Sequence, residues 1–258
     1  MLGTLIPAYA GLFGAVALGR SKPQYLAAIA IGIFLWFFSD TIGDSSYLGV
    51  NEGVSGGLSH VALVMLFATA LVLFFLAEGR VAPANGPGLI SSSLAIPILV
   101  AIALSIHGAG EGAGFGGAAS STSGASLIEA FGGYGPAVSY ILHKVLEPIA
   151  IGVCYSTFYL NPGKQGTPRW KNLAVAGAVF VIPTLIGTTA GYLIPFDTTY
   201  LFAAGVGASV YVLFKLMQAL FEPASPFRSY RESMRIAFLA LLGFALIYTA
   251  AILHSVSG

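Results

Sequence analysis

The stretch SIHGAGEG at residues 105–112 places His107 and Glu111 four positions apart in an apolar, glycine-rich segment. A second pair with the same spacing, His143 and Glu147, occurs in HKVLEP. Residues four apart in an α-helix lie on one face, with their Cβ atoms about 5–6 Å apart. Each pair therefore offers an imidazole and a carboxylate on one helical ridge, and two ridges facing each other would supply four ligands.

Imidazole and carboxylate ligands without thiolate suit divalent ions such as Zn²⁺, Fe²⁺ and Mn²⁺. The single cysteine, Cys154, lies in an apolar run, so the chain has neither a disulfide framework nor a thiolate metal site. We predict a metal site formed by His107, Glu111, His143 and Glu147. The residue types do not select one of these metals.

The composition indicates the surroundings of these ligands. Apolar residues make up 57% of the chain and charged residues only 8%, whereas charged residues are about 25% of a typical soluble domain. This predicts an integral membrane protein. A net charge of +1 excludes a nucleic-acid-binding surface.

Crossing the hydrocarbon region takes about 17–25 apolar residues as a helix. Eight segments meet this need: about 3–19, 25–48, 58–77, 89–116, 131–160, 172–195, 199–221 and 233–255. They are too long and continuous for barrel strands, and lipid admits only helices or closed barrels. We therefore predict an all-α, eight-helix membrane bundle over residues 1–258, forming one domain.

Basic residues alternate between the connections. Of the eleven Lys and Arg residues, nine lie in or beside the odd-numbered connections: Arg20, Lys22, Arg80, Lys164, Arg169, Lys171, Arg228, Arg231 and Arg235. Because basic loops remain cytoplasmic, both termini are predicted to be extracellular. The two exceptions are Lys144 and Lys215. Lys215 is near the inner end of its span, where it is predicted to extend to the headgroups.

Ionisable side chains at membrane depth cost free energy, so their presence there usually indicates a function. Beyond the four ligands, Asp40 and Asp44 are again four apart, near the outer end of the second span. They are predicted to form an acidic entrance that concentrates cations, and solvated helix-end residues are the alternative. Pro148 directly follows Glu147 and predicts a kink there.

With these motifs in view, the sequence resembles the ZIP family of divalent metal transporters. HGAGEG keeps His107, Glu111 and Gly112 of the family's H-N-x-P-E-G pattern in the fourth helix, and HKVLEP matches the pattern of the fifth. VIPTLIG at 181–187, FAAGVGASVYVLF at 202–214 and LLGFALI at 241–247 resemble its last three helices. The resemblance extends over nearly the whole chain.

The resemblance implies a binuclear metal centre between the fourth and fifth spans, with the four predicted ligands matching its first site. Three positions depart from the family pattern: Gly108 replaces its Asn, Gly110 its Pro, and Lys144 a carboxylate. Some family members also carry His-Lys at the last position, which implies a single-metal site in which the Lys144 ammonium replaces the second ion.

Two functions remain open at this point. One is a carrier in the plasma membrane that moves zinc, iron or manganese ions into the cytoplasm and needs no cofactor. The other is a ZIP-like structural or accessory subunit that has lost transport. Neither H-E-x-x-H nor a nucleophile paired with a base occurs, so an enzyme is not expected. The partners expected are the metal ion and the lipid bilayer, and both a homodimer and a larger membrane complex are compatible with the sequence.

Overall fold

The computed structural model describes residues 2–19, 22–45, 57–81, 94–121, 127–160, 168–194, 197–221 and 230–255. Within these ranges the regular structure is helical. The elements are α1 Leu2–Gly19, α2 Pro23–Ser45, α4 Gly57–Val81, α5 Ala95–Ser121, α6 Leu127–Ala130, α7 Tyr134–Leu146, α8 Ile149–Cys154, the π-helical turn η2 Tyr155–Tyr159, α9 Trp170–Leu193, α10 Thr199–Phe221 and α11 Tyr230–Ser255. The prediction of an all-α chain is confirmed for the described residues.

Six helical stretches in the described residues are long and apolar enough to cross a membrane: Ala62–Arg80, Ala95–Ser121, Tyr134–Tyr159, Trp170–Leu193, Thr199–Phe221 and Arg231–Leu253. Two shorter apolar helices, Gly3–Gly19 and Pro23–Ser39, precede them. The chain is thus a multi-pass membrane protein by length and composition. The count of eight spans stays a prediction.

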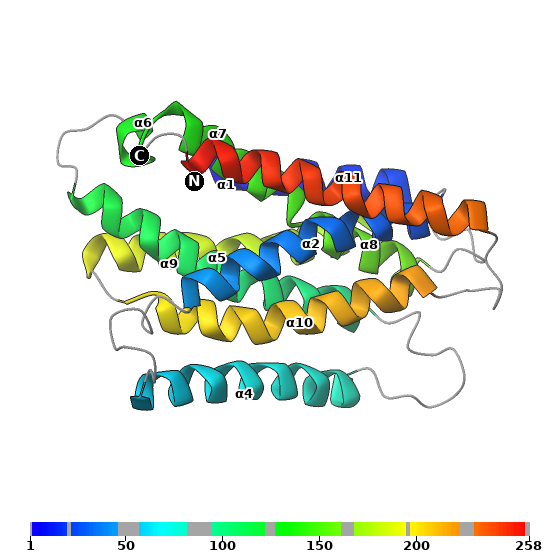
Figure 1. The fold of residues 1–258 in the computed structure, drawn as a ribbon, viewed down its shortest axis with the longest axis horizontal. Coiled ribbons are helices and arrows are strands. Elements are labelled where there is room, and N and C mark those ends of the chain that lie inside the picture. The colour runs from blue at the N-terminus through cyan, green and yellow to red at the C-terminus, as the bar shows by residue number, and fades with distance from the viewer. Residues whose placement is uncertain are drawn as a thin grey trace.

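The long helices run in alternating directions, and α1 begins at the end of the bundle where α11 finishes (Figure 1). This arrangement agrees with the prediction that both termini lie on one side of the membrane. That this side is extracellular stays a prediction.

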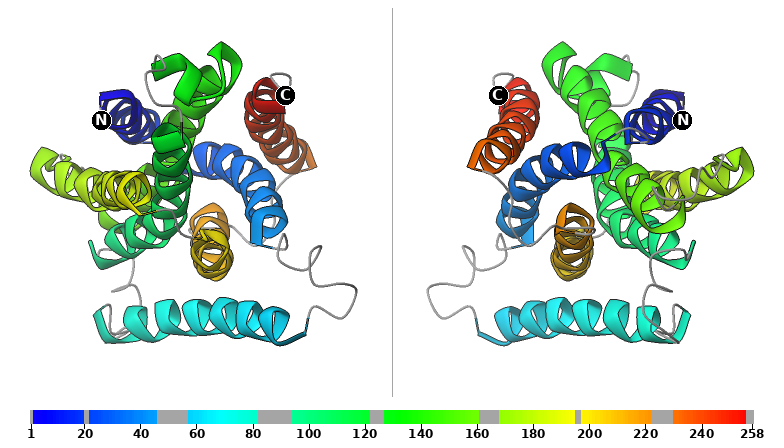
Figure 2. Two further views of the ribbon diagram at one scale, coloured as in Figure 1. Left: turned by 90° about the vertical axis from the view of Figure 1, so that its left-hand side faces the viewer. Right: turned by 90° about the vertical axis from the view of Figure 1, so that its right-hand side faces the viewer.

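Helix α5 lies in the interior, packed against α9 and α10, while α2 packs between α10 and α11 (Figure 2). Helix α1 covers α7, α8 and α9. Helix α4 stands apart on the outer side of α10, which is its main partner (Figures 1 and 2). The centrally placed α5 carries the first predicted ligand pair.

Glycines allow α5 and α9 to approach at backbone distance. A Cβ atom at Gly112 would overlap the carbonyl oxygen of Thr184, and one at Gly187 would overlap that of Ala109. Lipid supplies no hydrophobic force between helices, so close packing through small residues is a main source of their association. The glycines beside His107 do not interrupt α5, which is one continuous helix.

The second ligand pair lies at a break in its span. Helix α7 ends at Leu146, a turn at Glu147 and Pro148 follows, and α8 begins at Ile149. Proline has no N–H to continue the ladder, and its ring crowds the preceding turn. The helix is interrupted at the predicted position, and Glu147 lies at this interruption, close to Glu111 of α5.

Candidate metal centre

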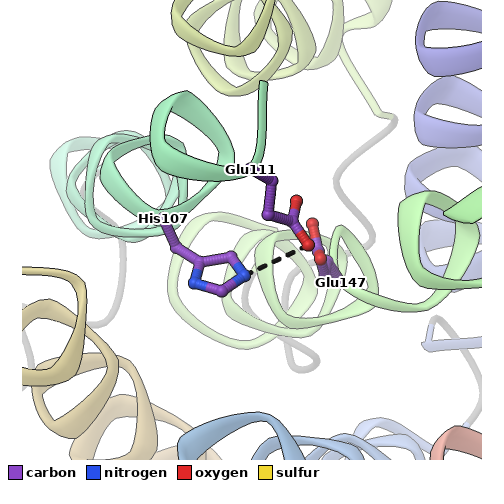
Figure 3. A group of neighbouring side chains, drawn as sticks. All are labelled: His107, Glu111 and Glu147. Carbon is purple, nitrogen blue, oxygen red and sulfur yellow. Dashed lines mark ion pairs between the residues drawn. The ribbon is translucent and has the colours of Figure 1, made fainter. Parts of the chain in front are cut away.

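Three of the four predicted ligands converge inside the bundle. The ligand atoms of His107, Glu111 and Glu147 all lie within 4.8 Å of one another, an arrangement that could hold a metal ion. Figure 3 shows the imidazole edge of His107 and the two carboxylates turned toward a common point. His107 and Glu147 are buried, whereas Glu111 keeps 23% of its side-chain surface exposed. Access to the cluster is therefore from the side of Glu111.

The contact between His107 and Glu111 confirms that these two residues share one helical face. His107 Nε2 lies 3.2 Å from Glu111 Oε1. A carboxylate oxygen cannot donate, and a bare Nε2 cannot either. The contact therefore requires a hydrogen on Nε2 or a cation shared by the two atoms.

Lys144 joins the two carboxylates of the cluster. Its ammonium donates to Glu147 Oε2 at 2.9 Å and also bonds Glu111 Oε2. The Lys144 side chain is fully buried, and its Nζ lies 5.6 Å from the ring centroids of both Tyr140 and Phe180. Lys144 thus supplies the positive charge that keeps two carboxylates together in a low-dielectric interior.

The carboxylate oxygens divide between two roles. Lys144 occupies the Oε2 atoms, whereas Glu111 Oε1 faces His107, and Glu147 Oε1 is buried with no hydrogen-bond partner among the described residues. An unpartnered buried carboxylate oxygen is costly and calls for an explanation. With a neutral His107, the two carboxylates and one ammonium leave one net negative charge, which a cation beside both Oε1 atoms would compensate.

His143, the fourth predicted ligand, is not part of this group. Its Nδ1 lies 2.9 Å from the backbone oxygen of Ser139 on the preceding turn of α7. Because a carbonyl oxygen can only accept a hydrogen bond, Nδ1 must carry the hydrogen of this contact. Nε2 is then the ring nitrogen with a free lone pair. Ligation by His143 stays a prediction.

Two residues of α2 and one of α10 contact His107, and none of these contacts was predicted from the sequence. The Phe37 ring lies 4.3 Å and the Phe202 ring 5.3 Å from the imidazole centroid. The hydroxyl oxygen of Thr41 lies 3.3 Å from His107 Nδ1. The i, i+4 spacing of Phe37 and Thr41 predicts a shared face of α2, but no sequence signal points that face at α5.

Two further predictions concern charges away from the cluster. Asp40 and Asp44 belong to α2, but their side chains lie outside the described residues, so the acidic entrance stays a prediction.

Lys215 does not extend to the headgroups as predicted. It is 6% exposed and donates to Glu78 Oε1 of α4 at 2.6 Å and to Gln218 Oε1 at 3.0 Å. An acidic partner on α4 makes the buried position the better one for the ammonium.

No protein-family model matches this chain, and no curated protein matches it.

Proposed function

We propose that the chain is a membrane carrier that moves a divalent cation, zinc, iron or manganese, into the cytoplasm through the His107, Glu111 and Glu147 cluster. The proposal depends on one observation: three ligands of the types that such ions take lie within 4.8 Å of one another inside a bundle of apolar helices. Ionisable groups at membrane depth commonly mark ion pathways. The resemblance of HGAGEG and HKVLEP to ZIP motifs supports the same function.

In this proposal the ion binds His107 Nε2 and the Oε1 atoms of Glu111 and Glu147. The division of the oxygens supports this placement, since Lys144 already holds both Oε2 atoms. Lys144 then remains in place as a permanent counter-charge and substitutes for a second ion. The site takes one divalent ion at a time.

His143 completes the ligand set when the ion is bound. It lies one helical turn before Glu147, and its Nε2 holds a lone pair while Nδ1 bonds the Ser139 carbonyl. A histidine whose other nitrogen donates to a backbone carbonyl is in the state that metal sites use.

The direction of transport follows from the loops. Basic connections are cytoplasmic, and the acidic pair Asp40 and Asp44 belongs to the opposite, outer end of the second predicted span. Cations concentrate at the acidic end, bind the cluster and leave on the basic side when the bundle changes between its two open states.

The experiment is uptake into liposomes that contain the purified protein, with Zn²⁺, Fe²⁺ or Mn²⁺ outside and an indicator dye inside. We expect uptake of at least one ion above that of empty liposomes, and its loss in Glu111→Ala. The matched control is Glu129→Gln, which changes an exposed carboxylate of α6 and should leave uptake unchanged. Folded wild-type protein that transports none of the three ions would refute the proposal.

A second candidate is a ZIP-like accessory subunit without transport. The contact of Lys144 with both carboxylates favours it, because the ammonium already offsets one of the two negative charges without a metal. Equilibrium binding separates the two candidates. A carrier binds Zn²⁺, Fe²⁺ or Mn²⁺ in a manner lost in Glu111→Ala, whereas an accessory subunit of this kind binds none of them.

A further inference from the structure

Thr41 of α2 contacts the side of His107 that faces away from the carboxylates. Its Oγ1 lies 3.3 Å from His107 Nδ1, and Nε2 on the opposite edge of the ring lies 3.2 Å from Glu111 Oε1. Thr41 has no exposed surface, and His107 is 2% exposed. Water therefore has little access to the Thr41 hydroxyl or to Nδ1, and Nδ1 depends on Thr41 for a partner.

The Thr41 hydroxyl has one hydrogen, and a second contact uses it. Thr41 Oγ1 donates to the backbone oxygen of Phe37 at 2.8 Å, a shorter distance than its contact with the imidazole. The carbonyl can only accept, so this bond takes the hydroxyl hydrogen. Thr41 then offers His107 a lone pair, and Nδ1 is the atom that must carry the hydrogen between them.

Two phenyl rings from different helices contact the ring of His107 and limit its rotation. Phe37 contacts it from α2 with an interplanar angle of 60°, and Phe202 contacts it from α10 with an angle of 58°. The two phenyl rings fix the plane of the imidazole, but they do not distinguish its two nitrogens.

We infer that Thr41 is a positioning residue that accepts a hydrogen bond from Nδ1 of His107 and thereby leaves Nε2, which faces Glu111, as the nitrogen that binds the ion. This inference rests on the proposed function only in treating His107 as a ligand, and the placement of the hydrogen stands without it. Metal-bound histidines usually donate their second nitrogen to a fixed acceptor, and losing that acceptor weakens metal binding about 10–100-fold. Here the acceptor is a hydroxyl from a different helix.

The first measurement is the nitrogen NMR spectrum of histidine-labelled protein, which distinguishes protonated from unprotonated ring nitrogens. The chain has four histidines, so the signals of His107 are assigned by their loss in His107→Gln. In metal-free wild-type protein we expect Nδ1 of His107 to carry a hydrogen that faces Thr41, and Nε2 to carry one that faces Glu111 and that a bound ion would displace. A spectrum with a bare Nδ1 would overturn the inference, and this measurement needs neither a variant of Thr41 nor metal binding.

The second measurement is Zn²⁺ affinity. Thr41→Val keeps the side-chain shape but removes the hydroxyl, and we expect it to weaken Zn²⁺ binding about 10–100-fold. Thr41→Ser restores the hydroxyl and should bind within about threefold of the wild type. The control Thr249→Val removes an exposed threonine hydroxyl that bonds a backbone carbonyl of α11 in the same way, and should have no effect.

The outcomes separate the two proposals. If wild-type protein binds no Zn²⁺, Fe²⁺ or Mn²⁺ but Nδ1 of His107 carries a hydrogen, the proposed function fails and the role of Thr41 in placing that hydrogen stands. If wild-type protein and Thr41→Val bind Zn²⁺ equally well, the positioning role is wrong and the metal site stands. Equal weakening in Thr41→Val and Thr41→Ser would also overturn it, because packing would then be the cause.

Discussion

Replacing Lys144 by methionine removes the positive charge between Glu111 and Glu147 and keeps most of the side-chain volume. The contact with Glu147 measures 2.9 Å between two side chains that are 0% and 1% exposed. With an effective dielectric constant of about 20, Coulomb's law gives about 6 kcal/mol for this one contact. Relaxation around the uncompensated charge reduces the net effect, and removing one partner of a buried ion pair typically costs about 3–5 kcal/mol.

The measurement is thermal unfolding of the detergent-purified protein. At roughly 2–4 °C per kcal/mol, the unfolding temperature of metal-free Lys144→Met should fall by about 6–20 °C. Lys171→Met is the control, because Lys171 is exposed at the start of α9, and it should unfold like the wild type. Because a bound divalent ion replaces the missing charge, Zn²⁺ should raise the unfolding temperature of Lys144→Met more than that of the wild type.

The double variant Lys144→Met/Glu147→Gln tests the electrostatic cause. It removes one charge of each sign, so it should recover most of the stability lost in Lys144→Met. The reasoning is refuted if Lys144→Met unfolds at the wild-type temperature, or if the double variant is no more stable than the single one. Either result would mean that the ammonium does not hold the two carboxylates together.

Three further predictions address packing, the second buried ion pair and pH. Gly112→Ala should lower the unfolding temperature, because a Cβ atom there overlaps the backbone of α9. Gly114→Ala on the same helix is the control, because a Cβ atom there meets nothing within 4 Å. This control should be neutral or should stabilise the protein by up to about 1 kcal/mol. Lys215→Met should destabilise the attachment of α4 to α10 by about 3–5 kcal/mol, and adding Glu78→Gln should recover most of this in a double-mutant cycle. Zn²⁺ should bind more weakly at pH 5 than at pH 7.5, because protons compete with the metal for His107; equal affinities in a binding titration would contradict this.

Local sequence determined the features that act within one helix. The apolar runs fix the membrane class, because segments of that length without charge cannot remain in water. The spacing of His107 and Glu111 places both on one face of α5, where they meet at 3.2 Å. Pro148 breaks its span wherever the rest of the chain lies, because the missing N–H and the ring act on the preceding turn.

Only the tertiary structure decided which partner each of these groups takes. His143 and Glu147 have the same spacing as the first pair, yet Glu147 reaches α5 while His143 turns back to Ser139. Lys144 bridges two helices, and Lys215 pairs with Glu78 on another helix instead of extending to the headgroups. The spacing of residues along one helix fixes their face, but the rotation and axial position of each helix against its neighbours depend on packing. In a bundle where small residues let backbones meet, those two quantities determine which buried charges and hydroxyls come within bonding distance.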